Sequence, residues 1–143
     1  MLIRKTEEKD LPSVELLYAC ARAFMRENGN GGQWGGEYPK REKLLEDISR
    51  GYSYVCLEGG EFLAVFSFCP SPDPTYAKIE EGAWLNEEPY RVIHRIAAGK
   101  KRRGAASFCL DWCFKQYPNI RIDTHKNNAP MLGLINKFGF KYC

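Results

Sequence analysis

The chain has 143 residues, of which 44% are hydrophobic and 27% charged. One core supports one domain at this length, so we expect a single domain over residues 1–143. The formal net charge of +3 argues against nucleic acid as a partner, because acidic residues match the basic ones everywhere except in Lys100–Arg103. No apolar run is long enough for a signal peptide or a membrane span, so we expect a cytoplasmic protein without membrane contact.

The first elements along the chain are a strand and two helices. Residues 2–5 form a short apolar strand, and apolar side chains recur at helical spacing over Asp10–Glu27, whose first residue is a candidate N-cap. Asn28–Gly36 is rich in glycine and predicts a loop. A second helical pattern covers Lys40–Arg50 and stops at Gly51.

A meander of strands follows. Tyr52–Glu58 and Glu61–Cys69 are rich in aromatic and branched residues, and only Gly59-Gly60 separates them, which indicates a tight β-hairpin. Tyr90–Ala98 predicts the next strand, buried on both faces near its end.

The last third of the chain predicts helix, strand, helix and strand. One helical face runs through Gly104–Tyr117, and Asn119–His125 forms a strand. Asn128 caps a last helix that Gly139 closes, and a final strand begins at Phe140. The element order predicts an α/β fold, in which a mixed central sheet carries helices on both faces.

The chain contains six cysteines. They fall within apolar segments that can form a core unaided, which favours reduced, buried thiols over a disulfide framework. Cys109 and Cys113 share a helix face without a Cys-x-x-Cys pair or a His-rich segment, so no metal site is expected. The other four are Cys20, Cys56, Cys69 and Cys143.

The turn between Ala98 and Gly104 has the composition of an anion site. Free N–H groups at a helix N-terminus bind phosphate, and small residues let the phosphate approach the backbone. Basic side chains add charge-assisted hydrogen bonds. A basic run is often only a solvated loop or a nucleic-acid contact. This run lies between a buried strand and a buried helix, where a phosphate loop belongs.

This turn resembles the pyrophosphate signature of the GNAT superfamily of N-acetyltransferases, Gln/Arg-x-x-Gly-x-Gly/Ala. The matching residues are Lys101, Arg102, Arg103, Gly104, Ala105 and Ala106, with Lys in first place. The family's following strand, Asn-capped helix and Gly-Phe resemble Arg121–His125, Asn127–Met131 and Lys137–Phe140. The element order also fits, so the resemblance covers nearly the whole chain.

The resemblance implies a mostly antiparallel sheet and transfer of an acetyl group from acetyl-coenzyme A (acetyl-CoA) to a primary amine of a small molecule or protein, by direct attack. Backbone groups of Ile96, Ala97 and Ala98 would line the pantetheine arm, and Lys101–Ala106 would hold the pyrophosphate. Asn128 would hydrogen-bond the arm, or serve only as a helix cap.

The general base is expected among few residues. His94 is the first candidate, because imidazole titrates near neutral pH and some similar members carry His at this strand position. The alternative is a hydrogen-bonded core histidine that holds the strand. Asp123 and His125 are further candidates, and Glu81 is a weaker one.

This chain differs from the family's pattern at the residue that would protonate the leaving thiolate. Many members carry Tyr on the last helix, where this chain has Ile135. Tyr142, Tyr90 or solvent would have to substitute for it.

The acceptor is expected between the loop that carries Gln33, Trp34 and Tyr38 and the segment Pro70–Pro89. Glutamates in that segment can attract a cationic amine, or can simply be solvated. Trp34 and Tyr38 can equally serve to pack their loop.

Two further departures leave rival interpretations open. The loop between Ala98 and Lys101 is short for the family, and the chain ends at Cys143, before the strand that normally completes the sheet. Either a partner, as in a homodimer, supplies that edge, or the edge is exposed. The short loop, together with Ile135 in place of the usual Tyr, suggests an alternative: a CoA-binding domain that no longer catalyses. A third interpretation is a nucleic-acid-binding module that uses Lys100–Arg103.

Overall fold

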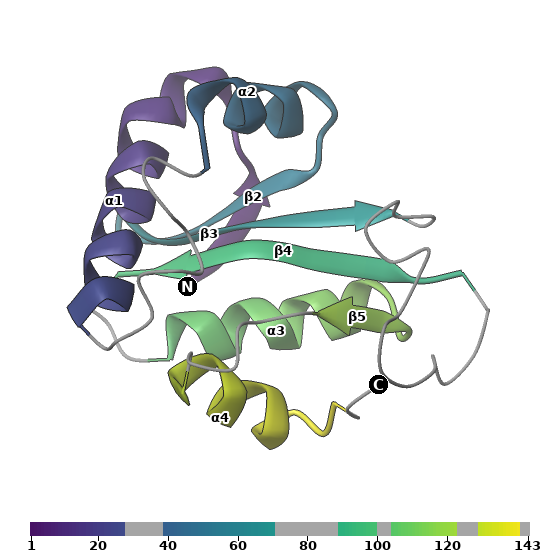
Figure 1. Ribbon diagram of the computed structural model, residues 1–143. Coiled ribbons are helices and arrows are strands. Elements are labelled where there is room, and N and C mark those ends of the chain that lie inside the picture. Colours follow the sequence, from purple (N-terminus) through teal and green to yellow (C-terminus); the bar gives the residue numbers. More distant parts are fainter. Residues whose placement is uncertain (28–38, 71–88, 100–103, 123–128, 141–143) are drawn as a thin grey trace.

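The computed structural model describes residues 1–27, 39–70, 89–99, 104–122 and 129–140 (Figure 1). After β1 (Leu2–Lys5) and the 3-10 turn η1 (Glu8–Asp10), the elements in chain order are α1 (Leu11–Glu27), α2 (Arg41–Ser49), β2 (Ser53–Glu58), β3 (Glu61–Pro70), β4 (Arg91–Ala98), α3 (Ala105–Gln116), β5 (Ile120–Ile122) and α4 (Ala129–Lys137).

The described strands form one sheet in the order β1-β2-β3-β4-β5. The first three pairs are antiparallel and β4 pairs with β5 in parallel. Helices α1 and α2 cover one face, and α3 and α4 cover the other (Figure 1). The prediction of a mixed, mostly antiparallel sheet with helices on both faces is confirmed.

The hairpin between β2 and β3 forms where the sequence predicts it. Gly59 and Gly60 have φ of +57° and +82°, the left-handed conformation that a two-residue turn with the right twist requires at both positions. Glu58 therefore pairs with Glu61 directly across the turn. The register shifts between Cys56 and Leu57, and beyond the shift Val55 pairs with Val65, both on the side of α1.

Two apolar clusters fill the space on either side of the sheet. On one face, Val14, Leu17 and Tyr18 of α1 pack on β2, β3 and β4. On the other face the cluster is built around α3, and Trp112 lies with its ring centroid 4.9 Å from that of Tyr54 on β2. Each cluster buries one stripe of its helix, as the apolar spacing of α1 and α3 predicts.

Asp10 is not the N-cap of the first long helix, and that prediction is wrong. The chain enters α1 through η1, so the N-cap of this turn is Glu7 and Asp10 stands three residues later. The Asp10 carboxylate accepts the Glu7 backbone N–H at 2.8 Å and two hydrogen bonds from Arg4, at 2.7 and 3.1 Å. The Arg4 guanidinium holds the pKa of Asp10 below its ordinary value of 3.8.

All the cysteines that the structure describes are free thiols. Cys56, Cys109 and Cys113 are buried and Cys69 is half-buried, but Cys20 is exposed, so the prediction of buried thiols is wrong for Cys20. Val14, Tyr18 and Met25 follow a helical repeat that Cys20 does not share. Burial raises the pKa of the Cys113 thiol to about 12.

Candidate functional site

A bulge interrupts β4 in its middle. Val65 of β3 pairs with Ala97 and Ser67 pairs with His94, so β4 has one residue more than β3 over this stretch. The backbone φ of Arg95 is +50°. The extra residue shifts the alternation of β4, because Ile93 and Ile96, three apart, both face the α3 cluster.

Beyond the bulge, β4 loses one of its two neighbours. Its first three residues, Arg91–Ile93, pair with Ile120–Ile122 of β5. From His94 onward, β3 is the only strand that pairs with β4 within the part of the chain that the structure describes. This end of the strand therefore borders a space that the described part of the sheet does not fill.

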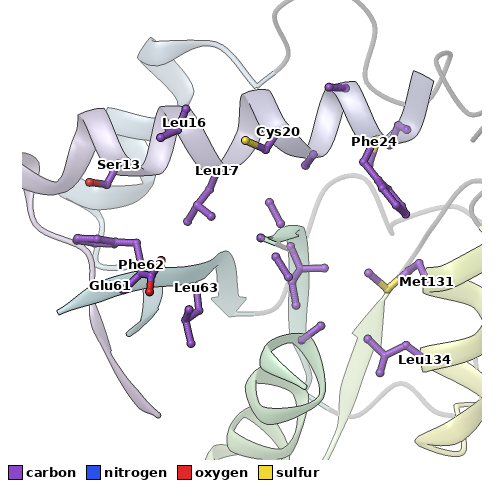
Figure 2. A pocket seen from close by; sticks show the side chains of 18 of the residues that line it. Ser13, Leu16, Leu17, Cys20, Phe24, Glu61, Phe62, Leu63, Met131 and Leu134 are labelled. Carbon is purple, nitrogen blue, oxygen red and sulfur yellow. The ribbon is translucent and has the colours of Figure 1, made fainter. Parts of the chain in front are cut away.

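A cavity of about 770 Å³ lies at this end of β4. Its walls come from α1, the start of β3, the end of β4, the first turn of α3 and α4 (Figure 2). Leu17 and Phe24 of α1 point into it from one side, and Met131 and Leu134 of α4 from another. Most of the lining is apolar, and its polar or charged side chains among the described residues are Ser13, Glu27 and Glu61.

Three residues predicted to line the pantetheine arm, Ile96, Ala97 and Ala98, all line this cavity. Ile96 is half-buried, Ala97 is 2% exposed, and Ala98 is exposed at the last position of the strand. The cavity continues past Gly99 to Ala106, in the first turn of α3. The end of β4 and the beginning of α3 thus share one space.

The N-terminus of α3 can bind an anion. The N-cap Gly104 has φ of +86°, and a Cβ at this position would meet nothing within 4 Å among the described atoms. The first helical hydrogen bond runs from the Phe108 N–H to the Gly104 carbonyl at 2.9 Å. The N–H groups of the preceding helical residues, from Ala105 on, have no acceptor within the helix. No acidic side chain lies in this turn, so a negative group is favoured there.

His94, the first candidate for the base, is half-buried on β4 opposite Ser67, directly before the bulge. It is not among the described residues that line the cavity. Ile135 is half-buried on α4. Tyr90 precedes β4 at the end away from the cavity, where the Arg121 guanidinium lies 3.8 Å from the centre of its ring.

The remaining predicted site residues lie outside the described residues and stay predictions. They are Lys101, Arg102 and Arg103 of the basic turn, Asp123, His125, Asn128 and Tyr142 near the end of the chain, Glu81, and the predicted acceptor residues Gln33, Trp34 and Tyr38.

Sequence reasoning missed a buried polar cluster at the bulge. The Arg95 guanidinium donates to Asp47 of α2 at 2.5 Å and to Ser67 of β3 at 3.1 Å. The Ser67 hydroxyl donates to the same Asp47 oxygen at 2.9 Å. An Arg within the otherwise apolar end of a predicted buried strand is the signal that could have pointed to it. The helical spacing of α1 likewise does not reveal that Phe24 lines a cavity.

The chain was compared with known proteins. No family model matches it, and no curated protein does. Among solved structures, it is similar to an acetyltransferase of the GNAT family from Streptococcus agalactiae, with 31% sequence identity and a TM-score of 0.90. The alignment covers 99% of this chain and 86% of that chain.

Two other solved structures share the fold. A Staphylococcus aureus protein assigned as an acetyltransferase is 28% identical, with a TM-score of 0.76 and coverage of 99% of this chain and 92% of that chain. A Clostridium acetobutylicum protein assigned as an acetyltransferase was solved with acetyl-CoA. It is 15% identical, with a TM-score of 0.60 and coverage of 99% and 90%.

Proposed function

This chain belongs to the GNAT family of acetyltransferases, and we propose that it transfers the acetyl group of acetyl-CoA to a primary amine. One observation carries the proposal: a bulged strand, an apolar cavity and a helix N-terminus lie next to one another. The bulged β4 ends beside an apolar cavity, and the same cavity reaches the first turn of a helix whose N-cap is Gly104.

The described residues fit acetyl-CoA. The pantetheine arm carries amides and methyl groups, which suit the backbone of Ile96–Ala98 and the apolar side chains of Met131 and Leu134. The pyrophosphate would lie at the N-terminus of α3, on Gly104, Ala105 and Ala106. In the proposal, Lys101, Arg102 and Arg103 add positive charge there, and Asn128 hydrogen-bonds the arm.

The chemistry proposed is direct attack. The acceptor ammonium loses a proton to the base, for which His94 and Asp123 are the proposed candidates. The amine nitrogen then attacks the thioester carbonyl, so that a C–N bond forms and the C–S bond breaks. A backbone N–H near Ile96 or Ala97 would stabilise the oxyanion. The nitrogen gives up its second proton to solvent as the C–S bond breaks, and the thiolate takes a proton from Tyr142 or from solvent.

The acceptor would approach from the segment between α1 and α2. α1 ends at Glu27, which lines the cavity, and the chain then continues to Gln33, Trp34 and Tyr38. We propose that these three residues contact the amine. The acceptor class extends to small molecules and protein amines alike.

Two measurements test the proposal in sequence. Calorimetric titration of the purified chain with acetyl-CoA should give saturable binding of one molecule per chain, and absence of heat at high protein concentration would rule the proposal out. Release of free thiol is then followed over a panel of amines. Binding without thiol release for any amine would instead support the alternative, a CoA-binding domain that does not catalyse, which the Ile135 position favours.

A further inference from the structure

The bulge of β4 contains the described chain's one non-glycine residue with positive φ, Arg95 at +50°. This left-handed conformation is unfavourable for a residue with a Cβ. Such strain persists only where the surrounding structure holds it in place. The contacts of Arg95 therefore hold the bulge in place.

Among the described residues, two separate sets of contacts hold Arg95. Its side chain is 8% exposed and pairs with Asp47, which is 3% exposed, and Ser67 hydrogen-bonds both partners. Lys43 adds a second cation, 3.5 Å from the other Asp47 oxygen. The Arg95 carbonyl accepts a hydrogen bond from the Tyr18 hydroxyl at 2.8 Å. The side chain thus ties the bulge to α2, and the backbone ties it to α1.

The bulge sets which way the end of β4 faces. Ile96 packs on the α3 side and Ala97 on the α1 side. Side chains alternate along a strand, so without the extra residue at position 95 every later side chain would turn to the opposite face. Ile96–Ala98 line the cavity in the orientation that the bulge gives them.

A buried ion pair is weak support for stability, because desolvation offsets much of its attraction, and its better-attested use is to select one conformation. We infer that Arg95, Asp47 and Ser67 are positioning residues that hold the bulge of β4 in the left-handed conformation on which acetyl-CoA binding depends. The inference rests on the proposed function. These side chains act through the backbone of Ile96–Ala98 and do not touch the ligand.

The sharpest test compares alanine with glycine at position 95. Both Arg95→Ala and Arg95→Gly remove the ion pair, and both are made together with Asp47→Asn so that no buried carboxylate loses its main cation. Glycine adopts positive φ freely, whereas alanine does not. We expect Kd for acetyl-CoA, measured by calorimetry, to rise at least tenfold with alanine, and glycine to recover roughly fivefold of that loss. Equal Kd values, or weaker binding with glycine, would overturn the inference.

Asp10→Asn is the matched control. It breaks the Arg4–Asp10 pair, which is joined by two hydrogen bonds but lies at β1, the edge of the sheet opposite β5. Asp47→Asn and Asp10→Asn should both lower Tm, and only Asp47→Asn should weaken acetyl-CoA binding, at a temperature where circular dichroism shows both folded. If Kd of Asp47→Asn stays within twofold of the unmodified chain, the pair is merely structural and the inference fails.

Tyr18→Phe keeps the test decisive should the ion-pair variants not fold. It removes only the hydroxyl that holds the Arg95 carbonyl, and we expect Kd to rise about threefold with a small change in Tm. An unchanged Kd would contradict the inference. Failure of the unmodified chain to bind acetyl-CoA would overturn the proposed function and this inference together, whereas loss confined to the variants supports both.

Discussion

The two ends of β4 behave as different kinds of structure. Arg91–Ile93 has a strand on each side, and Val92 and Ile93 are 0% and 2% exposed. Ile96–Ala98 pairs with β3 alone among the described strands and borders the cavity. The change from one to the other takes place at the bulge. One strand can therefore supply core at one end and a binding edge at the other, and substitutions at the two ends should affect different properties.

The largest expected effect is on stability, at the paired end. Ile93→Ala removes a buried side chain between β4 and α3 and should lower the free energy of unfolding by about 3 kcal/mol, measured by urea denaturation. The matched control is Leu2→Ala, since Leu2 is 61% exposed and should change it by less than about 0.5 kcal/mol. Acetyl-CoA affinity of folded Ile93→Ala should be unchanged. A tenfold weaker affinity would contradict the assignment of stability to one end of β4 and of acetyl-CoA binding to the other.

The next largest effect is expected on acetyl-CoA binding, at the end of β4 that borders the cavity and the first turn of α3. Ala106→Asp places a carboxylate in the first turn of α3, where it stabilises the helix but repels a pyrophosphate. We expect acetyl-CoA binding to weaken roughly 100-fold in calorimetry without a fall in Tm. Ala106→Asn is the uncharged control of equal size and should bind much more tightly than Ala106→Asp. Equal affinities of the two variants for acetyl-CoA would show that the pyrophosphate does not bind at the N-terminus of α3.

A smaller effect is expected at β1, the edge strand opposite β5. Asp10→Asn should cost about 1 kcal/mol of stability at neutral pH, because Arg4 is 34% exposed and the pair is partly screened. The folded pKa of Asp10 lies below 3.8, so its contribution is complete above pH 3.8 and is lost as pH falls through the folded value. Urea denaturation over pH 2 to 7 should show that the free energies of unfolding of the unmodified chain and Asp10→Asn converge in acid. A constant difference would contradict this assignment.

The smallest effect concerns the thiols. Cys20→Ser should change the free energy of unfolding by less than about 0.5 kcal/mol, because Cys20 is exposed. In the folded protein near pH 8, iodoacetamide should label Cys20 and leave Cys113 unmodified, since burial raises the pKa of Cys113 to about 12. Mass spectrometry of the labelled peptides measures both. Labelling of Cys113 at the rate of Cys20 would show that α3 opens readily.

Much of the fold could be predicted because its signals are local. Gly59-Gly60 specifies a hairpin through the φ values of two adjacent residues. The N-terminus of α3 follows from Gly104 and the small residues after it. The apolar repeat of α1 marks its buried stripe, although the 3-10 turn at Asp10 lay beyond what spacing can reveal.

The bulge could not be predicted, because its causes are far apart in the sequence. Arg95 is hydrogen-bonded to Asp47, 48 residues away, and to Tyr18, 77 residues away. The exposure of Cys20 and the position of Phe24 have a similar origin. Both depend on a cavity whose other walls come from β4, α3 and α4, so the repeat within α1 cannot distinguish core from cavity lining.

The short parallel contact between β4 and β5 has a consequence for how the molecule opens. Antiparallel neighbours such as β2 and β3 meet through a turn, whereas parallel pairing requires a crossover and forms slowly. Elements joined by few interactions also open first in the native state. In hydrogen–deuterium exchange, amides of β5 and of α4, the helix that follows it in the chain, should therefore exchange before those of β3. Because Met131 and Leu134 of α4 line the cavity, the rate at which ligands enter and leave would then be governed by the least protected element around it.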